Sequence, residues 1–133
     1  KQYGVASSVR FIGRIPHEQL PRYCALGDIF AMPSRSRLFG LEVEGLGIVY
    51  LEASACGLPV IAGNSGGAPD AVLPGETGVV VDGTSERAIA DAAISLLSDI
   101  SKSRDMGRVG REWVVGNWRW EIWSKTFNNL FNQ

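Results

Sequence analysis

Short runs of consecutive apolar residues recur along the chain and are separated by longer segments of mixed polarity. Runs of this kind, bounded by glycine, proline or aspartate, are typical of strands that are covered on both faces of a sheet. We therefore expect strands at residues 9–13, 29–32, 59–62 and 78–81.

The segments between these runs favour helices. Pro16 suits the first turn of a helix, Gly27 and Gly57 suit the end of one, and Ser85 is a good N-terminal cap. The expected helices span residues 16–26, 48–56, 85–98, 100–115 and 118–131, with a short helical turn at 70–72.

Strands that alternate with helices of this length form crossover units, and such units build a parallel sheet. The fold class expected is α/β, a Rossmann-like parallel sheet with helices on both faces. Residues 1–133 are long enough for one domain and too short for two. No further strand precedes residues 9–13 in the sequence, so we expect a partial domain that lacks its first strands.

Composition narrows the classes of function. The chain is 45% hydrophobic and 20% charged with a net charge of -1, which is typical of a globular protein and gives no support to nucleic-acid binding. Cys24 and Cys56 fall in helix-like stretches and are expected to be reduced, buried thiols. No signal peptide or membrane-spanning run is visible, so a cytoplasmic location is the default expectation.

A glycine-containing loop, Glu44-Gly45-Leu46-Gly47-Ile48, leads into the helix expected at residues 48–56. Glycines let the backbone approach a ligand closely, and the first turn of a helix carries N–H groups without partners inside the helix. In open parallel sheets such loops lie at the edge where ligands bind. The loop therefore predicts a site for a phosphate or pyrophosphate.

Two glutamates flank this helix start. Glu52 lies about one turn into the helix, where its carboxylate can accept two hydrogen bonds from a diol such as a ribose. Glu44 precedes the helix, where it can meet a hydroxyl of a sugar or, alternatively, cap N–H groups of the same helix. For Glu52 the alternative is an ordinary solvated helix face.

Other polar features are less specific. The loop Ser65-Gly66-Gly67 follows an expected strand and either offers N–H groups to a ligand or simply makes a turn. His17 is the only histidine, and we expect it to be a solvated residue at a helix start rather than a catalytic one.

The stretch EGLGIVYLEASACGLPVIAGNSGGAPDAV, followed by GETGVVVDG, resembles the donor-site signature of the family-four retaining glycosyltransferases with the GT-B fold. The resemblance begins at VRFIGRIPHEQLPRYCALGDIFAMPSRSR and covers nearly the whole chain. It is strongest to the GDP-mannose-dependent phosphatidylinositol mannosyltransferases. This resemblance implies that the chain is the C-terminal, donor-binding half of a GT-B enzyme.

The resemblance also implies roles for individual residues. Glu44 would contact the donor sugar and is the catalytic candidate, and Glu52 would hold the ribose. Gly45, Leu46, Gly47 and Ile48 would contact the sugar and the diphosphate. The loop after the FxG motif would touch the base, which indicates Ile15.

The same resemblance implies that other parts of the enzyme lie outside this chain. The N-terminal acceptor domain is one, and the arginine–lysine pair that neutralises the diphosphate is another, because Arg14, Arg35 and Arg37 do not match it. No Asp-x-Asp occurs, so neither a metal nor another cofactor is expected. The expected partners are a nucleoside diphosphate sugar, the acceptor domain and a lipid acceptor at the inner face of the membrane, where the intact enzyme would be peripheral.

Four tryptophans lie near the C-terminus, at positions 113, 118, 120 and 123. We expect them to pin the terminal helices to the core, with part of that surface exposed if the other domain normally covers it. Two further classes of function stay open beside the enzyme domain. One is a non-catalytic Rossmann-like module that binds a nucleotide or a sugar, and the other is an interaction domain without a ligand.

Overall fold

A computed structural model describes residues 4–131. Its centre is a three-stranded sheet in the order β1-β2-β3, with both pairs parallel. The strands are β1 (Phe30–Met32), β2 (Val60–Gly63) and β3 (Gly78–Val81). Ala31 is opposite Ile61, and Ile61 is opposite Val79, so the carboxyl ends of the strands lie at one edge.

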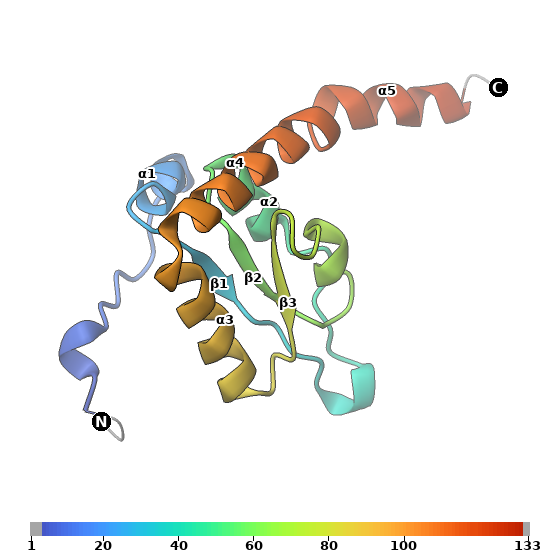
Figure 1. The fold of residues 1–133 in the computed structure, drawn as a ribbon. Coiled ribbons are helices and arrows are strands. Elements are labelled where there is room, and N and C mark those ends of the chain that lie inside the picture. The colour runs from blue at the N-terminus through green and yellow to red at the C-terminus, as the bar shows by residue number, and fades with distance from the viewer. Residues whose placement is uncertain (1–3, 132–133) are drawn as a thin grey trace.

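Helices cover both faces of this sheet, as the alternation of elements predicts (Figure 1). The α-helices are α1 (Leu20–Cys24), α2 (Ile48–Ala55), α3 (Glu86–Ser98), α4 (Ile100–Asn117) and α5 (Trp120–Phe131). Short 3₁₀ turns are η1 (Ala6–Ser8), η2 (His17–Gln19), η3 (Leu38–Gly40) and η4 (Ala68–Ala71). The expected fold class of a parallel α/β sheet with helices on both faces is confirmed.

Strand β2 lies at the centre of the core, and all of its residues are buried. Its side chains alternate between the two faces, as strand geometry requires. Val60 and Ala62 pack with Tyr50 of α2, whereas Ile61 packs with Leu96 of α3 and Met106 of α4. This two-sided burial explains why the strand is a continuous apolar run.

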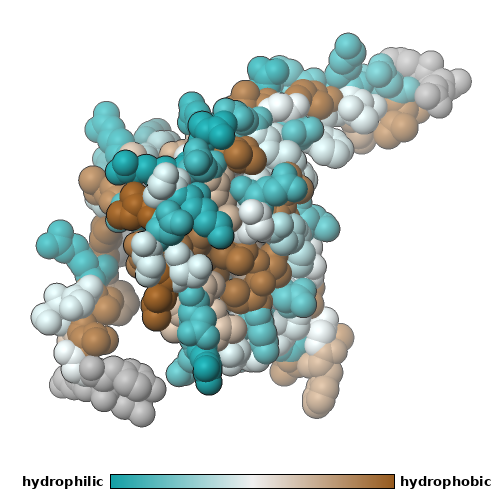
Figure 2. Space-filling model, in the orientation of Figure 1, coloured by the Kyte–Doolittle hydropathy of each residue, from teal (hydrophilic) through white to brown (hydrophobic). Residues whose placement is uncertain are grey.

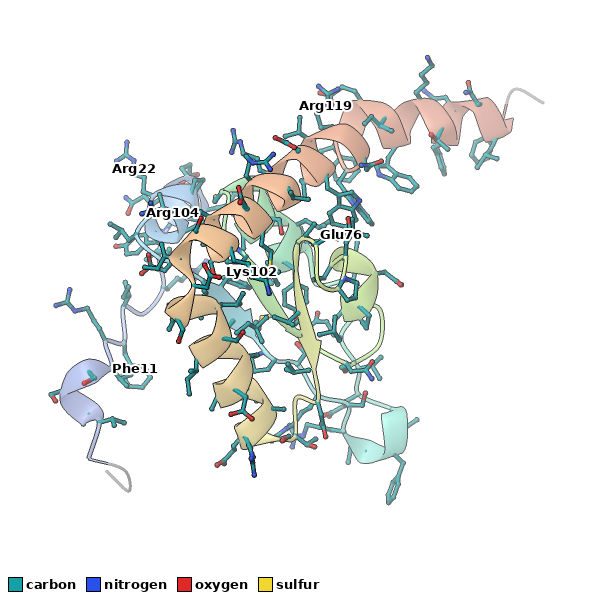
Figure 3. All side chains as sticks on the ribbon, in the orientation of Figure 1. Phe11, Arg22, Glu76, Lys102, Arg104 and Arg119 are labelled. Carbon is teal, nitrogen blue, oxygen red and sulfur yellow. The ribbon has the colours of Figure 1, made fainter. Side chains whose placement is uncertain are left out.

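Residues 9–13 do not form the strand that their apolar character predicts. They form neither a strand nor a helix, Gly13 has a φ of 75°, and Phe11 is 93% exposed. Figure 3 shows Phe11 on the N-terminal segment, away from the sheet. The prediction was wrong because an apolar run carries no information about which edge it would pair with, and a strand needs that partner.

The expected helix at residues 16–26 is also shorter in the structure. It consists of η2 followed by the five residues of α1. In contrast, α2 and α3 agree with their expected bounds to within a residue, and Gly57 ends the first of these with a φ of 83°. That left-handed conformation is one that glycine adopts without strain.

The C-terminal helices use the tryptophans in two ways. Trp113 and Trp118 pack against the core, with their rings 5.8 Å apart in a T-shaped pair. Trp120 on α5 is 85% exposed, and α5 leaves the body of the domain (Figure 1), with hydrophobic residues visible along it in Figure 2. On the same helix, the ring of Trp123 lies 5.7 Å from that of Trp118, and its Nε1 donates to the carbonyl of Asn117 at 2.9 Å. The expectation that the tryptophans pin the terminal helices therefore holds for three of the four and not for Trp120. Among residues 4–131, no helix has the length and apolar character that crossing a bilayer requires.

Replacing Ser85 with alanine should lower the free energy of unfolding by about 0.5 to 2 kcal/mol. Its Oγ accepts a hydrogen bond from the backbone N–H of Ala88 at 3.2 Å and so caps α3. Chemical denaturation measures the change. The matched control is Ser85→Asp, which keeps an acceptor at the cap and should unfold at the wild-type denaturant concentration, while an unchanged midpoint for Ser85→Ala would contradict the role of the cap.

Candidate functional site

The glycine loop lies where the sequence predicts it, at the start of α2. Gly47 caps this helix with a φ of 72°, and no side chain makes a capping hydrogen bond there. A Cβ on Gly47 would lie 2.3 Å from the ring of Tyr50, so only glycine fits at this position. Gly45 and Ile48 are exposed, whereas Gly47 itself is buried against that ring. The helix start is therefore open to a ligand on either side of Gly47.

The loop Ser65-Gly66-Gly67 makes hydrogen bonds to the backbone of the first glycine loop, at Glu44 and Gly45. The backbone N–H of Gly67 donates to the carbonyl oxygens of Glu44, at 3.2 Å, and of Gly45, at 2.8 Å. A Cβ on Gly66 would lie 1.9 Å from the carbonyl oxygen of Glu44. The Oγ of Ser65 accepts the N–H of Glu44 at 3.2 Å. The turn interpretation of this loop is thus confirmed, and its contacts hold the backbone around Glu44 in place.

The carboxylate of Glu44 accepts a hydrogen bond from the loop that follows β1. Ser34, two residues after β1, donates from Oγ to Oε2 of Glu44 at 2.8 Å. The hydroxyl of Tyr50 lies 2.9 Å from the same Oγ and donates to the carbonyl of Met32 at 2.6 Å. The side-chain hydrogen bond of Glu44 is made with Ser34 and not with an N–H group of α2, which argues against the alternative that Glu44 caps this helix.

Glu52 lies one turn into α2 and is half-buried. It borders two cavities, one of about 440 Å³ on the side of Trp118 and one of about 320 Å³ on the side of α1. Among residues 4–131, no ion pair involves Glu44 or Glu52. Glu52 is therefore in a position to accept hydrogen bonds from a ligand in either cavity.

Ile15 borders a third cavity, of about 580 Å³, beside η2. This cavity shares His17 and Leu20 with the cavity of about 320 Å³ that Glu52 borders. The structure thus places Ile15 and Glu52 at two adjoining hollows of one surface. His17 is exposed, as expected, and it lies at the junction of the two hollows.

The same surface contains features that the sequence did not indicate. Cys24 and Cys56 both border the cavity beside Glu52 and are free, half-buried thiols rather than fully buried ones. Burial raises the pKa of the Cys24 thiol, and the neighbouring Cys56 raises it further. Arg111 of α4 also borders this cavity and donates a hydrogen bond to the carbonyl of Ala55. This hydrogen bond ties α4 to the end of α2.

Arg37, which precedes the glycine loop, is paired with a carboxylate other than the two candidate glutamates. Arg37 forms an exposed ion pair with Glu42 at 3.7 Å, across a small antiparallel bridge between the same two residues. Between them, Leu38 and Phe39 have positive φ angles, and Phe39 is fully exposed. Across residues 4–131, no three histidine, cysteine, aspartate or glutamate side chains gather in a way that could hold a metal ion.

A parallel α/β sheet with a glycine-capped helix start at its carboxyl edge is typical of the class of Rossmann-like domains. The family model for glycosyl transferases group 1 matches residues 1–113. The chain therefore belongs to the glycosyl transferases group 1 family.

A curated relative from Mycolicibacterium smegmatis, a GDP-mannose-dependent alpha-(1-6)-phosphatidylinositol monomannoside mannosyltransferase, is 58% identical over 117 residues, or 88% of this chain. The chain spans 31% of the length of that relative.

Two solved structures share the fold. The sucrose-phosphate synthase of Thermosynechococcus elongatus aligns with a TM-score of 0.84 and 36% identity over 99% of this chain and 31% of its own. The C-terminal domain of a glycosyl transferase group 1 family protein from Francisella tularensis aligns with a TM-score of 0.77 and 28% identity over 90% of this chain and 58% of its own. The expected assignment to the C-terminal half of a GT-B glycosyltransferase is confirmed.

Proposed function

We propose that this chain is the donor-binding domain of a retaining mannosyltransferase that uses GDP-mannose. In the intact enzyme the mannosyl group would pass to a hydroxyl of a phosphatidylinositol glycolipid. The name of the 58% identical relative supports this donor and this acceptor. The observation that carries the proposal is the open start of α2, which lies between Glu44 and Glu52.

Each site residue has a role in this proposal. Glu44 contacts a hydroxyl of the mannose, and Glu52 accepts hydrogen bonds from the ribose. The start of α2 faces the diphosphate, and the hollow beside Ile15 takes the base. The loop residues that approach the sugar and the diphosphate are Gly45, Leu46, Gly47 and Ile48.

The helix dipole of α2 alone is not enough to stabilise the negative charge of the leaving diphosphate. A helix dipole contributes about 0.3 to 1 kcal/mol at an exposed site and up to about 2 kcal/mol when partly buried. We infer that cationic side chains outside this chain also stabilise the charge of the diphosphate, and that no metal or other cofactor takes part. The missing cations and the acceptor site would come from the N-terminal domain and the adjoining loop.

The location of the intact enzyme follows from the proposed acceptor. A phosphatidylinositol glycolipid is a membrane component, and a GDP-sugar is a water-soluble donor. We infer that the intact enzyme works in the cytoplasm, as a peripheral protein at the inner face of the membrane.

We expect this chain alone to have no transferase activity, even where it binds the nucleotide. Holding donor and acceptor together can supply roughly 7 to 11 kcal/mol of barrier reduction, and one wall of that cleft lies outside the chain. The test incubates the purified chain with GDP-mannose and phosphatidylinositol-type acceptors, and repeats the assay after the N-terminal portion is supplied.

Transfer only in the reconstituted pair would support the proposal. Mannosyl transfer by the chain alone would refute the proposal that the donor site and the acceptor site lie on different portions of the enzyme.

A further inference from the structure

We propose that Ser34 is a positioning residue that aims the carboxylate of Glu44 at the donor sugar. This inference rests on the proposed function, because it concerns the carboxylate that we assign to the sugar. The observation behind it is the hydrogen-bonded series that joins Glu44, Ser34, Tyr50 and the carbonyl of Met32.

The direction of the hydrogen bonds follows from the number of hydrogens available. An ionised carboxylate only accepts, so the hydrogen between Ser34 and Glu44 belongs to Ser34. Ser34 has one hydroxyl hydrogen, and it is used in that bond. The contact between Ser34 and Tyr50 must then use the phenol hydrogen, which Tyr50 shares between the Oγ of Ser34 and the carbonyl of Met32. Tyr50 therefore orients Ser34, and Ser34 orients Glu44.

The other members of the series have little freedom to move. Tyr50 has no exposed surface, and its ring packs edge-on against Phe30 of β1 with the centroids 6.2 Å apart. The backbone N–H of Ser34 donates to the carbonyl of Met32 at 2.8 Å. Because Tyr50 and the backbone of Ser34 are fixed, the hydroxyl of Ser34 is a preorganised donor. It holds the carboxylate of Glu44 without a further loss of side-chain freedom when the ligand binds.

Two glycines at the neighbouring strand ends fix the backbone of Ser34. A Cβ on Gly63, the last residue of β2, would lie 1.7 Å from the carbonyl oxygen of Ser34. A Cβ on Gly83, two residues after β3, would lie 2.3 Å from the same oxygen. The ends of all three strands therefore meet at Ser34, and neither glycine tolerates a side chain without moving it.

The consequence for binding concerns one of the two carboxylate oxygens. Ser34 donates to Oε2 of Glu44, and Oε1 accepts no hydrogen bond from a side chain among residues 4–131. An oxygen held in this way can accept a hydrogen bond from a sugar hydroxyl in one fixed direction. Without Ser34 the carboxylate would rotate, and the cost would fall on the sugar alone, because the ribose is assigned to Glu52.

The test measures the affinity of the chain for GDP-mannose and for GDP by calorimetry, and uses the ratio of the two. Ser34→Ala should reduce the preference for GDP-mannose about twofold to tenfold and leave the affinity for GDP unchanged. Ser34→Thr, which keeps the hydroxyl, should restore the preference. Tyr50→Phe keeps the ring and should give a smaller loss in the same direction.

The control variant is Thr84→Ala, which removes a hydroxyl that follows the neighbouring strand β3 and binds Asp82 instead of Glu44. It should leave the ratio unchanged. A merely structural role for Ser34 predicts equal losses for GDP and GDP-mannose, and that outcome overturns the inference, as does an unchanged ratio in Ser34→Ala. If the wild-type chain binds GDP and GDP-mannose with equal affinity, that result contradicts the proposed contact between Glu44 and the sugar, and with it the role of Ser34.

Discussion

Replacing Glu52 with alanine should weaken the binding of GDP to this chain about tenfold to a hundredfold. The carboxylate is half-buried at the edge of two cavities and free of ion pairs among residues 4–131. A hydrogen bond to a charged group contributes about 1.5 to 3 kcal/mol, and each 1.4 kcal/mol is a factor of ten in affinity. Calorimetry with GDP and GDP-mannose measures the loss, which should be similar for both ligands.

Two further variants separate the ribose role from other effects. Glu44→Ala should weaken GDP-mannose binding and leave GDP binding unchanged, because only the sugar reaches Glu44. Glu76→Ala removes the same charge from an exposed turn (Figure 3) and should change neither affinity. Equal losses of GDP affinity in the Glu44 and Glu52 variants would contradict the assignment of the two carboxylates.

Replacing Gly107 with alanine should lower the free energy of unfolding by about 1 to 3 kcal/mol, the usual range for an overpacked core. Gly107 lies in α4 where this helix crosses the turn between α2 and β2. A Cβ there would lie 1.9 Å from the carbonyl oxygen of Gly57. Because backbone cannot swing aside as a side chain does, α4 must move away from the turn. Denaturation by urea, monitored by far-ultraviolet circular dichroism, measures the change.

The same helix provides a matched control. Gly116 is exposed near the end of α4, and a Cβ there would meet nothing within 4 Å. Gly116→Ala should therefore stabilise the chain by up to about 1 kcal/mol, because alanine is the better helix former. If both alanine variants were stabilised equally, the close contact between α4 and the Gly57 turn would not exist in solution.

The elements that the sequence predicted well are those whose local signal and burial agree. The strand at residues 60–63 is apolar throughout and has helices on both sides, and α3 has both a capping serine and a long apolar stripe. The apolar run at residues 9–13 gives the same local signal without a partner, and it forms no strand. Periodicity reports what a segment can bury, not which neighbour it finds.

Prediction of the site from the sequence was likewise limited to residues that form a local pattern. The glycine loop and its two glutamates were recognisable because they are adjacent in the sequence, and the structure places them around one helix start. Ser34 and Tyr50 were missed, and Ser65 was noted only as part of a loop, because each acts through one hydroxyl on a residue that is distant in the sequence. A serine after a strand carries no signal by itself, and only the packing of three strand ends gives this one a function.

The most direct test of the central claim is a nuclear magnetic resonance titration of the chain with GDP-mannose, which follows every backbone amide. A donor bound at the start of α2 should cause the largest chemical-shift changes at the amides of Gly45, Gly47 and Ile48. The amides of Glu52 and Ile15 should change together with them. UDP-glucose should produce smaller shifts at the base hollow beside Ile15. Shifts confined to the exposed helix α5, or no shifts at millimolar GDP-mannose, would contradict the assignment of this chain as a donor-binding domain.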